Sequence, residues 1–391
     1  MPHRTLTHCA GALAVALAVA IHVNSARAIT VTSPGTRTVT QRNDLNRATL
    51  EISGTYVEAA TQIEARAVPR AGYSGTATEW QVIDASPAGG NYSGTLNATG
   101  GWYDVEVRAV SGGTPLGNAT VNRIGVGEVF ITAGQSNSAN HGAEGPESPT
   151  DDRVSAYNPA TGWQVANDPQ PVATGGGGSP WPSLGDQMTA KYDVPVGFYS
   201  VGWGGTSVAQ WVPGAPGPDT DPLYDRLQDA INYLGTDGMR AILWHQGESD
   251  NGSNTSTANY ASRLQSVIDQ SRIDAGFDVP WLVALVSYIP PSNFDSNIIS
   301  GQQLVIANDP FTYLGPDTDT LTGSPWRDGG GSGIHFSSIG LAEHARLWLE
   351  AIDNANIVLN VPEPNTCGLI TALLLMHAPL RRRRHGRAGP S

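Results

Sequence analysis

The sequence predicts an α/β protein in which a small antiparallel β-sandwich precedes a domain built on a doubly wound parallel sheet. Residues 29–124 contain short β-prone runs separated by Gly, Pro, Ser and Asn clusters, without any run of helical length and period. From residue 125 onward, near-continuous apolar runs alternate with helix-like segments. That alternation is typical of a parallel sheet covered by helices on both faces.

The clearest strand of the first part is 102–109, in which Val105, Val107 and Ala109 alternate with charged residues. A period of two indicates a half-buried strand. Similar runs predict an immunoglobulin-like sandwich over residues 29–124. The expected strands are 48–57, 62–68, 79–84, 91–99, 102–110 and 119–124.

The second part, residues 125–358, contains four strongly apolar runs with helical candidates between them. The expected strands are 129–133, 196–201, 241–244 and 281–287, and the expected helices are 181–192, 223–234, 259–273, 298–307 and 337–352. The stretch 140–180 shows no element, and we expect this long loop to form a wall of a substrate cleft.

The N-terminus has the pattern of a secretory signal peptide. Arg4 and His8 precede an apolar stretch over 10–23, and Ala26-Arg27-Ala28 is a small-residue cleavage site. We therefore expect a secreted or envelope-associated protein whose mature chain begins at Ile29. The alternative, an N-terminal membrane anchor, needs an apolar span of about 20 residues, and this stretch is shorter.

The charge and cysteine content exclude two classes of protein. The 391-residue chain carries a net charge of −13, which becomes −20 once the seven arginines of residues 1–28 and 366–391 are removed. Such a surface repels phosphate backbones, so we expect no nucleic-acid partner. The two cysteines, Cys9 and Cys367, lie near the ends, so the body of the chain has no disulfide framework.

A serine nucleophile is the strongest chemical signal. Ser136 follows the buried run 129–133 through Gly134, at the carboxyl end of a predicted parallel strand, where sites form in such sheets. A serine needs a base and donors for the oxyanion. His335, just before the last helix, is the best base, and Gly204 with Gly205 can offer backbone N–H groups.

These segments resemble the blocks of SGNH-type hydrolases, and more narrowly the sialate O-acetylesterase and acetylxylan esterase group, carbohydrate esterase family 6. The matching blocks are 127–137, 204–206, 244–250 and His335. The resemblance implies a three-layer α/β/α, flavodoxin-like fold without metal or other cofactor, and removal of acetyl groups from an acetylated carbohydrate.

Carried over by position, the resemblance implies that Ser136 is the nucleophile and His335 the base. The backbone N–H groups of Ser136 and of the Gly204–Gly205 turn, with the Gln246 side chain, would form the oxyanion hole. We also expect Asn137 and Trp211 to contact substrate.

The sequence does not decide which residue is the acid that orients the histidine. The family pattern places an aspartate three residues before the histidine, but here that residue is Ser332. Asp328 precedes Gly329-Gly330-Gly331 and can fold back toward His335; Glu248 is a second candidate, and a Ser–His pair without a carboxylate is a third.

The C-terminal segment 359–391 resembles a PEP-CTERM sorting signal, with Val361-Pro362-Glu363-Pro364, an apolar run over 368–380 and four arginines over 381–384. The resemblance implies processing by an exosortase-type enzyme and transient membrane association, with the arginines on the cytoplasmic side. A disordered tail is the alternative.

Other functions remain as alternatives. A non-catalytic carbohydrate-binding or envelope-adhesion protein on an esterase-like scaffold is compatible with the displaced acid, and the ester could belong to a non-sugar substrate. An α/β-hydrolase is disfavoured because no Gly-x-Ser-x-Gly elbow occurs. A metal site of His245, Glu248 and Asp250 has no familiar ligand spacing.

Overall fold

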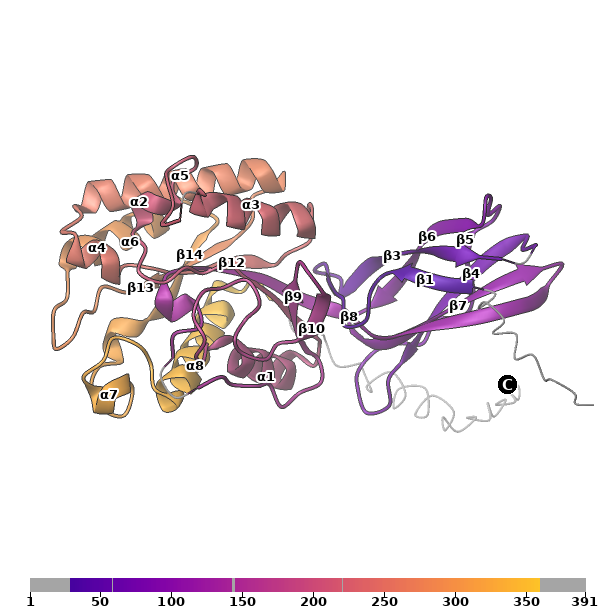
Figure 1. The fold of residues 1–391 in the computed structure, drawn as a ribbon, viewed down its shortest axis with the longest axis horizontal. Coiled ribbons are helices and arrows are strands. Elements are labelled where there is room, and N and C mark those ends of the chain that lie inside the picture. The colour runs from indigo at the N-terminus through magenta and orange to yellow at the C-terminus, as the bar shows by residue number, and fades with distance from the viewer. Residues whose placement is uncertain (1–28, 58, 143–144, 220, 359–391) are drawn as a thin grey trace, which may run out of the picture.

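One long strand, β8 (Thr114–Gly134), runs through both parts of the protein. The computed structural model describes residues 29–57, 59–142, 145–219 and 221–358. The N-terminal part of β8 belongs to a β-sandwich and its C-terminal part is the central strand of an α/β domain, which lies beside the sandwich along the long axis (Figure 1). The predicted boundary between residues 124 and 125 therefore falls inside a strand.

The β-sandwich has two sheets around one apolar core, with β1-β3-β6 on one side and β5-β4-β7-β8 with β2 on the other. All pairs are antiparallel except β2 with β8. The strands are β1 (Ile29–Ser33), β2 (Val39–Gln41), β3 (Arg47–Tyr56), β4 (Gln62–Pro69), β5 (Gln81–Asp84), β6 (Asn91–Thr99) and β7 (Gly101–Ser111).

The α/β domain is built on the strand order β10-β9-β11-β8-β12-β13-β14, in which only the edge pair β9–β10 is antiparallel. From β11 to β14 this is the flavodoxin-like 2-1-3-4-5 order. The strands are β9 (Val154–Asn158), β10 (Gly162–Val165), β11 (Val196–Ser200), β12 (Ala241–His245), β13 (Trp281–Leu285) and β14 (Thr312–Asp317).

Helices cover both faces of this sheet, which confirms the predicted three-layer α/β/α fold. In Figure 1 α2, α3, α5 and α6 lie above the sheet and α1 and α8 below it, with a separate apolar core on each side. The helices are α1 (Trp181–Tyr192), α2 (Val208–Trp211), α3 (Leu223–Leu234), α4 (Glu248–Gly252), α5 (Thr257–Ala275), α6 (Ser296–Asn308), α7 (Asp328–Gly331) and α8 (Ser338–Ala355). Short 3₁₀ turns occupy Ser136–Ser138 and Thr318–Thr320.

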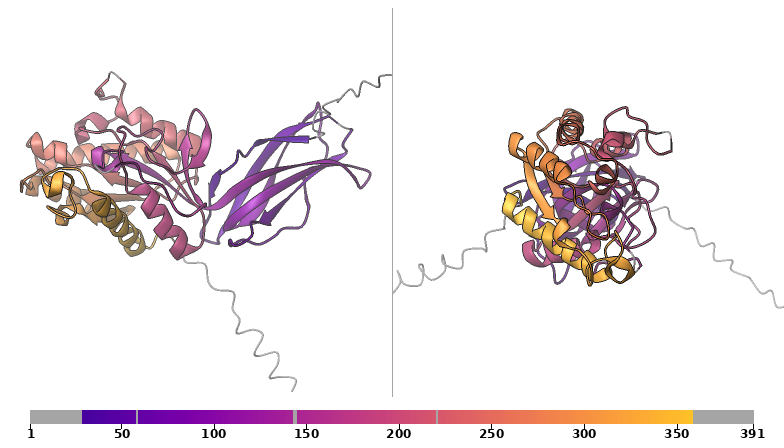
Figure 2. Two further views of the ribbon diagram at one scale, coloured as in Figure 1. Left: turned by 60° about the horizontal axis from the view of Figure 1, so that its bottom comes forward. Right: turned by 90° about the vertical axis from the view of Figure 1, so that its left-hand side faces the viewer.

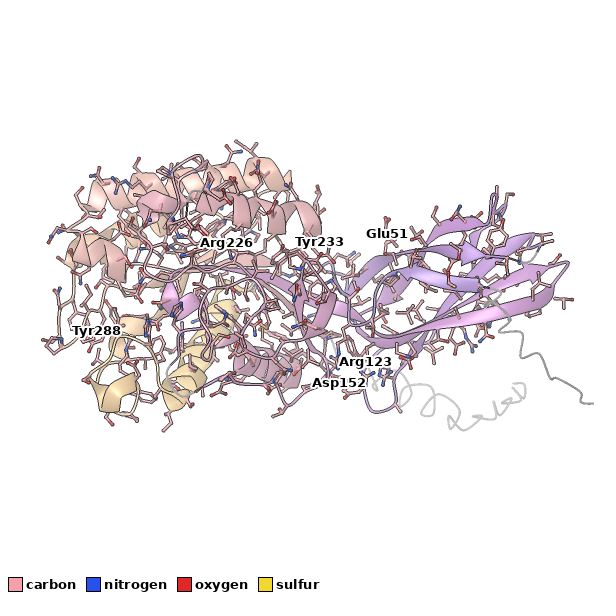
Figure 3. All side chains as sticks on the ribbon, in the orientation of Figure 1. Glu51, Arg123, Asp152, Arg226, Tyr233 and Tyr288 are labelled. Atoms are coloured by element: carbon pink, nitrogen blue, oxygen red, sulfur yellow. The ribbon has the colours of Figure 1, made fainter. Side chains whose placement is uncertain are left out.

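Ion pairs tie the two parts together on either side of β8. Glu128, whose side chain is fully buried, accepts bonds of 2.7 Å from Arg42 of the sandwich and 2.7 Å from Arg240 of the α/β domain. Asp152, just before β9, pairs with Arg37 and with Arg123 of β8 (Figure 3). The left view of Figure 2 shows the chain passing from the sandwich into the sheet of the α/β domain along β8.

The structure adds elements that the sequence pattern does not predict. β1, β2 and β14 were missed, and β9 and β10 lie inside the stretch 140–180, for which no element was expected. Within the described ranges, no helix is long and apolar enough to cross a membrane. The predicted signal peptide (1–28) and sorting tail (359–391) lie outside the described residues.

Candidate active site

Three strand ends bring the candidate residues to one edge of the sheet. Ser136 follows β8, Gly204 follows β11 and Glu248 follows β12, and these are the three adjacent central strands. Gly134 permits the close approach at this edge: its φ is +126°, and a Cβ there would lie 2.1 Å from the His245 carbonyl oxygen.

The turn that carries Ser136 is held by its neighbours. The Gln135 N–H donates to the His245 carbonyl over 2.9 Å, and the Ser138 Oγ donates back to the Ala133 carbonyl over 2.9 Å. Trp181 donates its ring N–H to the Ser138 carbonyl. Ser136 itself is 6% exposed and its side chain is not committed to any of these bonds.

His335 lies opposite Asp328 in a narrow folded segment. The Asp328 N–H donates to the His335 carbonyl over 2.9 Å, and the Asp328 Oδ2 lies 3.9 Å from the His335 Nδ1. The glycines 329–331 all have positive φ, which allows the chain to turn back between the two residues. Of the two predicted acids, Asp328 is therefore the one placed beside His335.

Burial lowers the pKa of His335 below 6.5, its usual value, and Arg327 acts in the same direction, while Asp328 opposes the shift. A histidine with a lowered pKa is neutral at physiological pH. Since only neutral imidazole can accept a proton, His335 is in the correct state for a general base.

Arg327 fixes the segment around His335. Its guanidinium donates to the carbonyls of Ile334, Leu321 and Thr318 and lies over the rings of Tyr288 and Phe336. Figure 3 places Tyr288 at the end of the α/β domain remote from the sandwich. Sequence reasoning missed Arg327, because a basic residue before a glycine run gives no signal of its buried partners.

His141 is a second residue that the sequence analysis passed over. Its ring lies 5.4 Å from the ring of His335, and Nε2 lies 3.3 Å from the Thr174 Oγ1. Burial lowers the pKa of His141, and the nearby His335 adds to this effect. The only sequence signal was its place in the long loop after the nucleophile, which was expected to form a wall of the cleft.

Glu248 lies beside the nucleophile without an ion pair to His335 among the described residues. Its Oε1 accepts a bond of 2.8 Å from Asn137, and Asn137 also donates to the Ile334 carbonyl. Burial raises the pKa of Glu248. Asn137 is 3% exposed and both bonds point into the protein, so it joins Glu248 to the His335 segment instead of facing substrate as predicted.

The donors predicted for an oxyanion hole need two corrections. The Gly204 N–H is occupied, because it donates to the Thr174 Oγ1 over 2.8 Å, whereas Gly205 lies next to it with open space at its Cα. The Gln246 amide is buried, and its Nε2 faces three acceptors: Asp250, Thr206 and Gln135. Neither group is available to a substrate oxygen.

Trp211 does not contact substrate as expected. It has no exposed surface and packs in the core, with its ring 5.4 Å from that of Trp244. Its ring N–H donates to the Thr206 Oγ1. A side chain without exposed surface cannot touch a ligand, so the predicted substrate contact of Trp211 is wrong. Through its bond to Thr206, Trp211 instead stabilises the turn after β11.

The remaining candidates surround one open pocket of about 440 Å³, here called the Ser136 pocket. Its walls are Gln135, Ser136, His141, Gly204, Gly205, Glu248, Ser249, Gly252, Ile289, Ile334 and His335. Ser136, the His335 imidazole and the Gly204–Gly205 turn therefore line the same space, and acyl transfer needs a nucleophile, a base and oxyanion donors close together. Among the described residues, no cluster of three or more His, Cys, Asp or Glu side chains is arranged to hold a metal ion.

Residues 126–314 match the family model described as carbohydrate esterase, sialic acid-specific acetylesterase. The matched residues make up most of the α/β domain. The α/β domain is therefore a carboxylic ester hydrolase. The match includes the turns after β8, β11 and β12 and ends before Asp328 and His335. The roles of these two residues are therefore argued only from the geometry of the site.

A solved structure of similar fold supports this architecture. A carbohydrate acetylesterase from Xanthomonas citri is 18% identical, with a TM-score of 0.50 over 82% of this chain and 74% of that chain. A protein from Arabidopsis thaliana is 18% identical, with a TM-score of 0.45 over 59% of this chain and 99% of that chain. No curated protein gave a significant match to the chain.

Proposed function

We propose that this esterase removes O-acetyl groups from carbohydrates of the sialate or xylan type, with Ser136 as nucleophile, His335 as base and Asp328 as the acid that orients it. The observation that carries the proposal is the meeting of Ser136 and His335 in one pocket, with Asp328 behind the histidine. The family description supports acetyl esters of sugars as the substrate class.

The reaction proceeds in two halves. The neutral His335 takes the Ser136 proton while Oγ attacks the acetyl carbonyl carbon, and the tetrahedral oxyanion is held by the backbone N–H groups of Ser136 and Gly205. The C–O bond to the sugar then breaks, and the alcohol leaves with the proton from His335. Water, deprotonated by His335, attacks the acetyl-serine and releases acetate and free Ser136.

The walls of the pocket suit a small acyl group on a polar alcohol. Ile289, Ile334 and Gly252 offer apolar surface for a methyl group, while Glu248, Ser249 and His141 supply polar groups. The pocket is open to solvent, which leaves room for the sugar outside the reacting centre. We expect the β-sandwich (29–124) to hold the esterase domain on its target.

We further propose export of the protein and transient attachment to the cell envelope. The support comes from sequence alone: the signal-peptide pattern over 1–28 and the PEP-CTERM-like segment over 359–391, which an exosortase-type enzyme would process. Immunoblotting of cell fractions tests the proposed export and attachment, with the unaltered protein compared with a variant in which Arg381–Arg384 are replaced by alanine. Retention of the unaltered protein in the cytoplasm would contradict it.

The decisive experiment is acetate release by the wild-type protein and by Ser136→Ala, on 4-nitrophenyl acetate, acetylated xylan and O-acetylated sialic acid. The alanine variant should lose activity by a factor of about 10⁴ or more. Ser253→Ala, at the exposed end of α4, is the matched control and should match wild type.

Each outcome separates the alternatives. Ser136-dependent release from the sugars supports the proposal. Faster turnover of longer-chain, non-sugar esters points to a general esterase. A folded wild-type protein that releases no acetate from any substrate overturns the proposal in favour of a carbohydrate-binding role.

A further inference from the structure

Gln135, the residue before Ser136, presents an amide group to the Ser136 pocket in a fixed orientation. Its Oε1 accepts two bonds, one of 3.1 Å from the Ser249 N–H and one of 3.2 Å from the Gln246 Nε2. Because both partners are donors, this atom must be the amide oxygen. The chemistry of the contacts therefore decides which end of the amide is which.

The other end of the amide, Nε2, is free to act as a donor. No described residue accepts a hydrogen bond from Nε2. This atom is also not one of the fully buried side-chain nitrogen and oxygen atoms that lack a hydrogen-bond partner. Gln135 as a whole is only 2% exposed and is a wall of the Ser136 pocket. Because Gln135 lines the Ser136 pocket and its amide oxygen is held by protein donors, a group bound in the pocket can accept a hydrogen bond from this N–H₂.

The contacts of Gln246 place this amide near the predicted oxyanion site. The Gln246 Nε2 lies 3.2 Å from the Gln135 Oε1 and 3.1 Å from the Thr206 carbonyl. Gln246 therefore joins the Gln135 side chain to the turn that contains Gly205. The Gln135 amide, the Gly205 turn and the Ser136 backbone consequently surround the same part of the pocket.

We propose that the Gln135 Nε2 donates a hydrogen bond to the acyl oxygen as it becomes an oxyanion, which makes Gln135 a catalytic residue and Gln246 its positioning residue. This inference rests on the proposed serine-esterase function. The amide is held before substrate arrives, and preorganised donors in a buried site act most strongly on the charge that develops in the transition state. The loss of one such donor lowers kcat by about 10²- to 10³-fold.

The test is Gln135→Glu, which keeps the shape and the accepting Oε1 but replaces the donor N–H₂ by an oxygen. We expect kcat on 4-nitrophenyl acetate at neutral pH to fall by about 10²- to 10³-fold with little change in KM. Gln135→Met, which removes the donor without adding charge, should show a loss of the same order. Gln303→Glu, at an exposed position of α6, adds the same charge outside the pocket lining and should match wild type.

A raised KM with unchanged kcat would overturn the proposal, because it would show that Gln135 binds the ground state of the substrate. Wild-type kcat in both Gln135 variants would overturn it as well. Circular dichroism and the thermal midpoint of each variant establish that it is folded.

A second measurement separates failure of this inference from failure of the proposed function. A 4-nitrophenyl alkylphosphonate forms a tetrahedral adduct on a reactive serine, and the release of nitrophenol gives the rate. Reaction of wild type but not of Ser136→Ala supports the serine esterase, and slower reaction of Gln135→Glu supports the donor. Equal rates for wild type and Gln135→Glu overturn only the role of Gln135, whereas an unreactive wild type overturns the esterase itself.

Discussion

The Asp328 Oδ2 lies 3.9 Å from the Nδ1 of His335, so the only carboxylate paired with this histidine among the described residues comes from a residue seven positions earlier in the chain. The separation is longer than a hydrogen bond but short enough for a charge interaction. Asp328 therefore favours the protonated form of His335, which forms when the base takes the serine proton.

Asp328→Asn should lower kcat and move the acid limb of the pH–rate profile to lower pH. His335 must be neutral to act, so activity is lost as pH falls through its pKa, which burial lowers and Asp328 raises. Without Asp328 that pKa falls further. The kcat loss should be smaller than the ~10⁴-fold effect of a hydrogen-bonded triad acid. kcat/KM is measured across pH, with the exposed Asp225→Asn as control. An unchanged profile would mean that Ser136 and His335 work as a pair.

Gly333→Ala should reproduce the effect of removing Asp328. A Cβ at Gly333 would lie 1.4 Å from the Asp328 Oδ1, so the carboxylate must move. We expect a kcat loss close to that of Asp328→Asn and no further loss in the double variant, because both changes remove one contact. Gly176→Ala, with nothing within 4 Å of the added Cβ, is the matched control. Additive losses in the double variant would contradict this reasoning.

The sequence could predict the elements whose pattern is periodic and apolar. α1 and α3 occur at the predicted residues 181–192 and 223–234. β14 could not be predicted, because its sequence Thr-Tyr-Leu-Gly-Pro-Asp has no apolar run and becomes a strand only by pairing with β13. The full length of β8 could not be predicted either, because Gly125 and Gly127 interrupt its apolar pattern. Within the strand, Arg123 has a positive φ.

In the site, the sequence could predict which residues gather at the sheet edge but not where their polar atoms point. Ser136, Gly205 and His335 gather there because each follows a strand or precedes a helix. The bond from the Gly204 N–H to Thr174 depends on the segment 140–180, and the burial of Trp211 depends on packing against Trp244. Such contacts join residues far apart in sequence, and no local pattern encodes them.

Glu248→Gln should change stability with pH more than it changes catalysis. The variant keeps an oxygen for Asn137, and Glu248 has no ion pair with His335, so kcat should stay within about ten-fold of wild type. A decrease in kcat as large as that of Asp328→Asn would instead indicate that Glu248 is the acid that orients His335.

The stability effect follows from burial, which raises the pKa of Glu248 above 4.5, its usual value. Among the charged groups around it, Asp319 raises this pKa further and Arg327 lowers it. A carboxyl with a raised folded-state pKa stabilises the protein below the unfolded pKa, and this contribution is lost as pH rises through the folded value. Wild type should therefore lose thermal stability relative to Glu248→Gln as pH rises above about 4.5, as measured by melting midpoints. If the melting midpoints of the two proteins change in parallel with pH, the titration of Glu248 does not affect stability.

Glu128→Gln should weaken the junction between the sandwich and the esterase domain while leaving the Ser136 pocket intact. Glu128 is fully buried between Arg42 and Arg240, and its loss leaves two arginines without their shared carboxylate. Breaking a buried ion pair on one side costs about 3–5 kcal/mol. Asp44→Asn is the control, because Asp44 pairs with the same Arg240 but is 70% exposed, and exposed pairs contribute about 1 kcal/mol or less.

The free energy of unfolding is measured by denaturant titration, with kcat at low temperature recorded on the same samples. Glu128 lies at the opposite end of the β8 segment from Ser136, so kcat should not change. If Glu128→Gln and Asp44→Asn prove equally stable, the buried carboxylate does not hold the two parts together, and the apolar contacts along β2, β7 and β8 must do so alone.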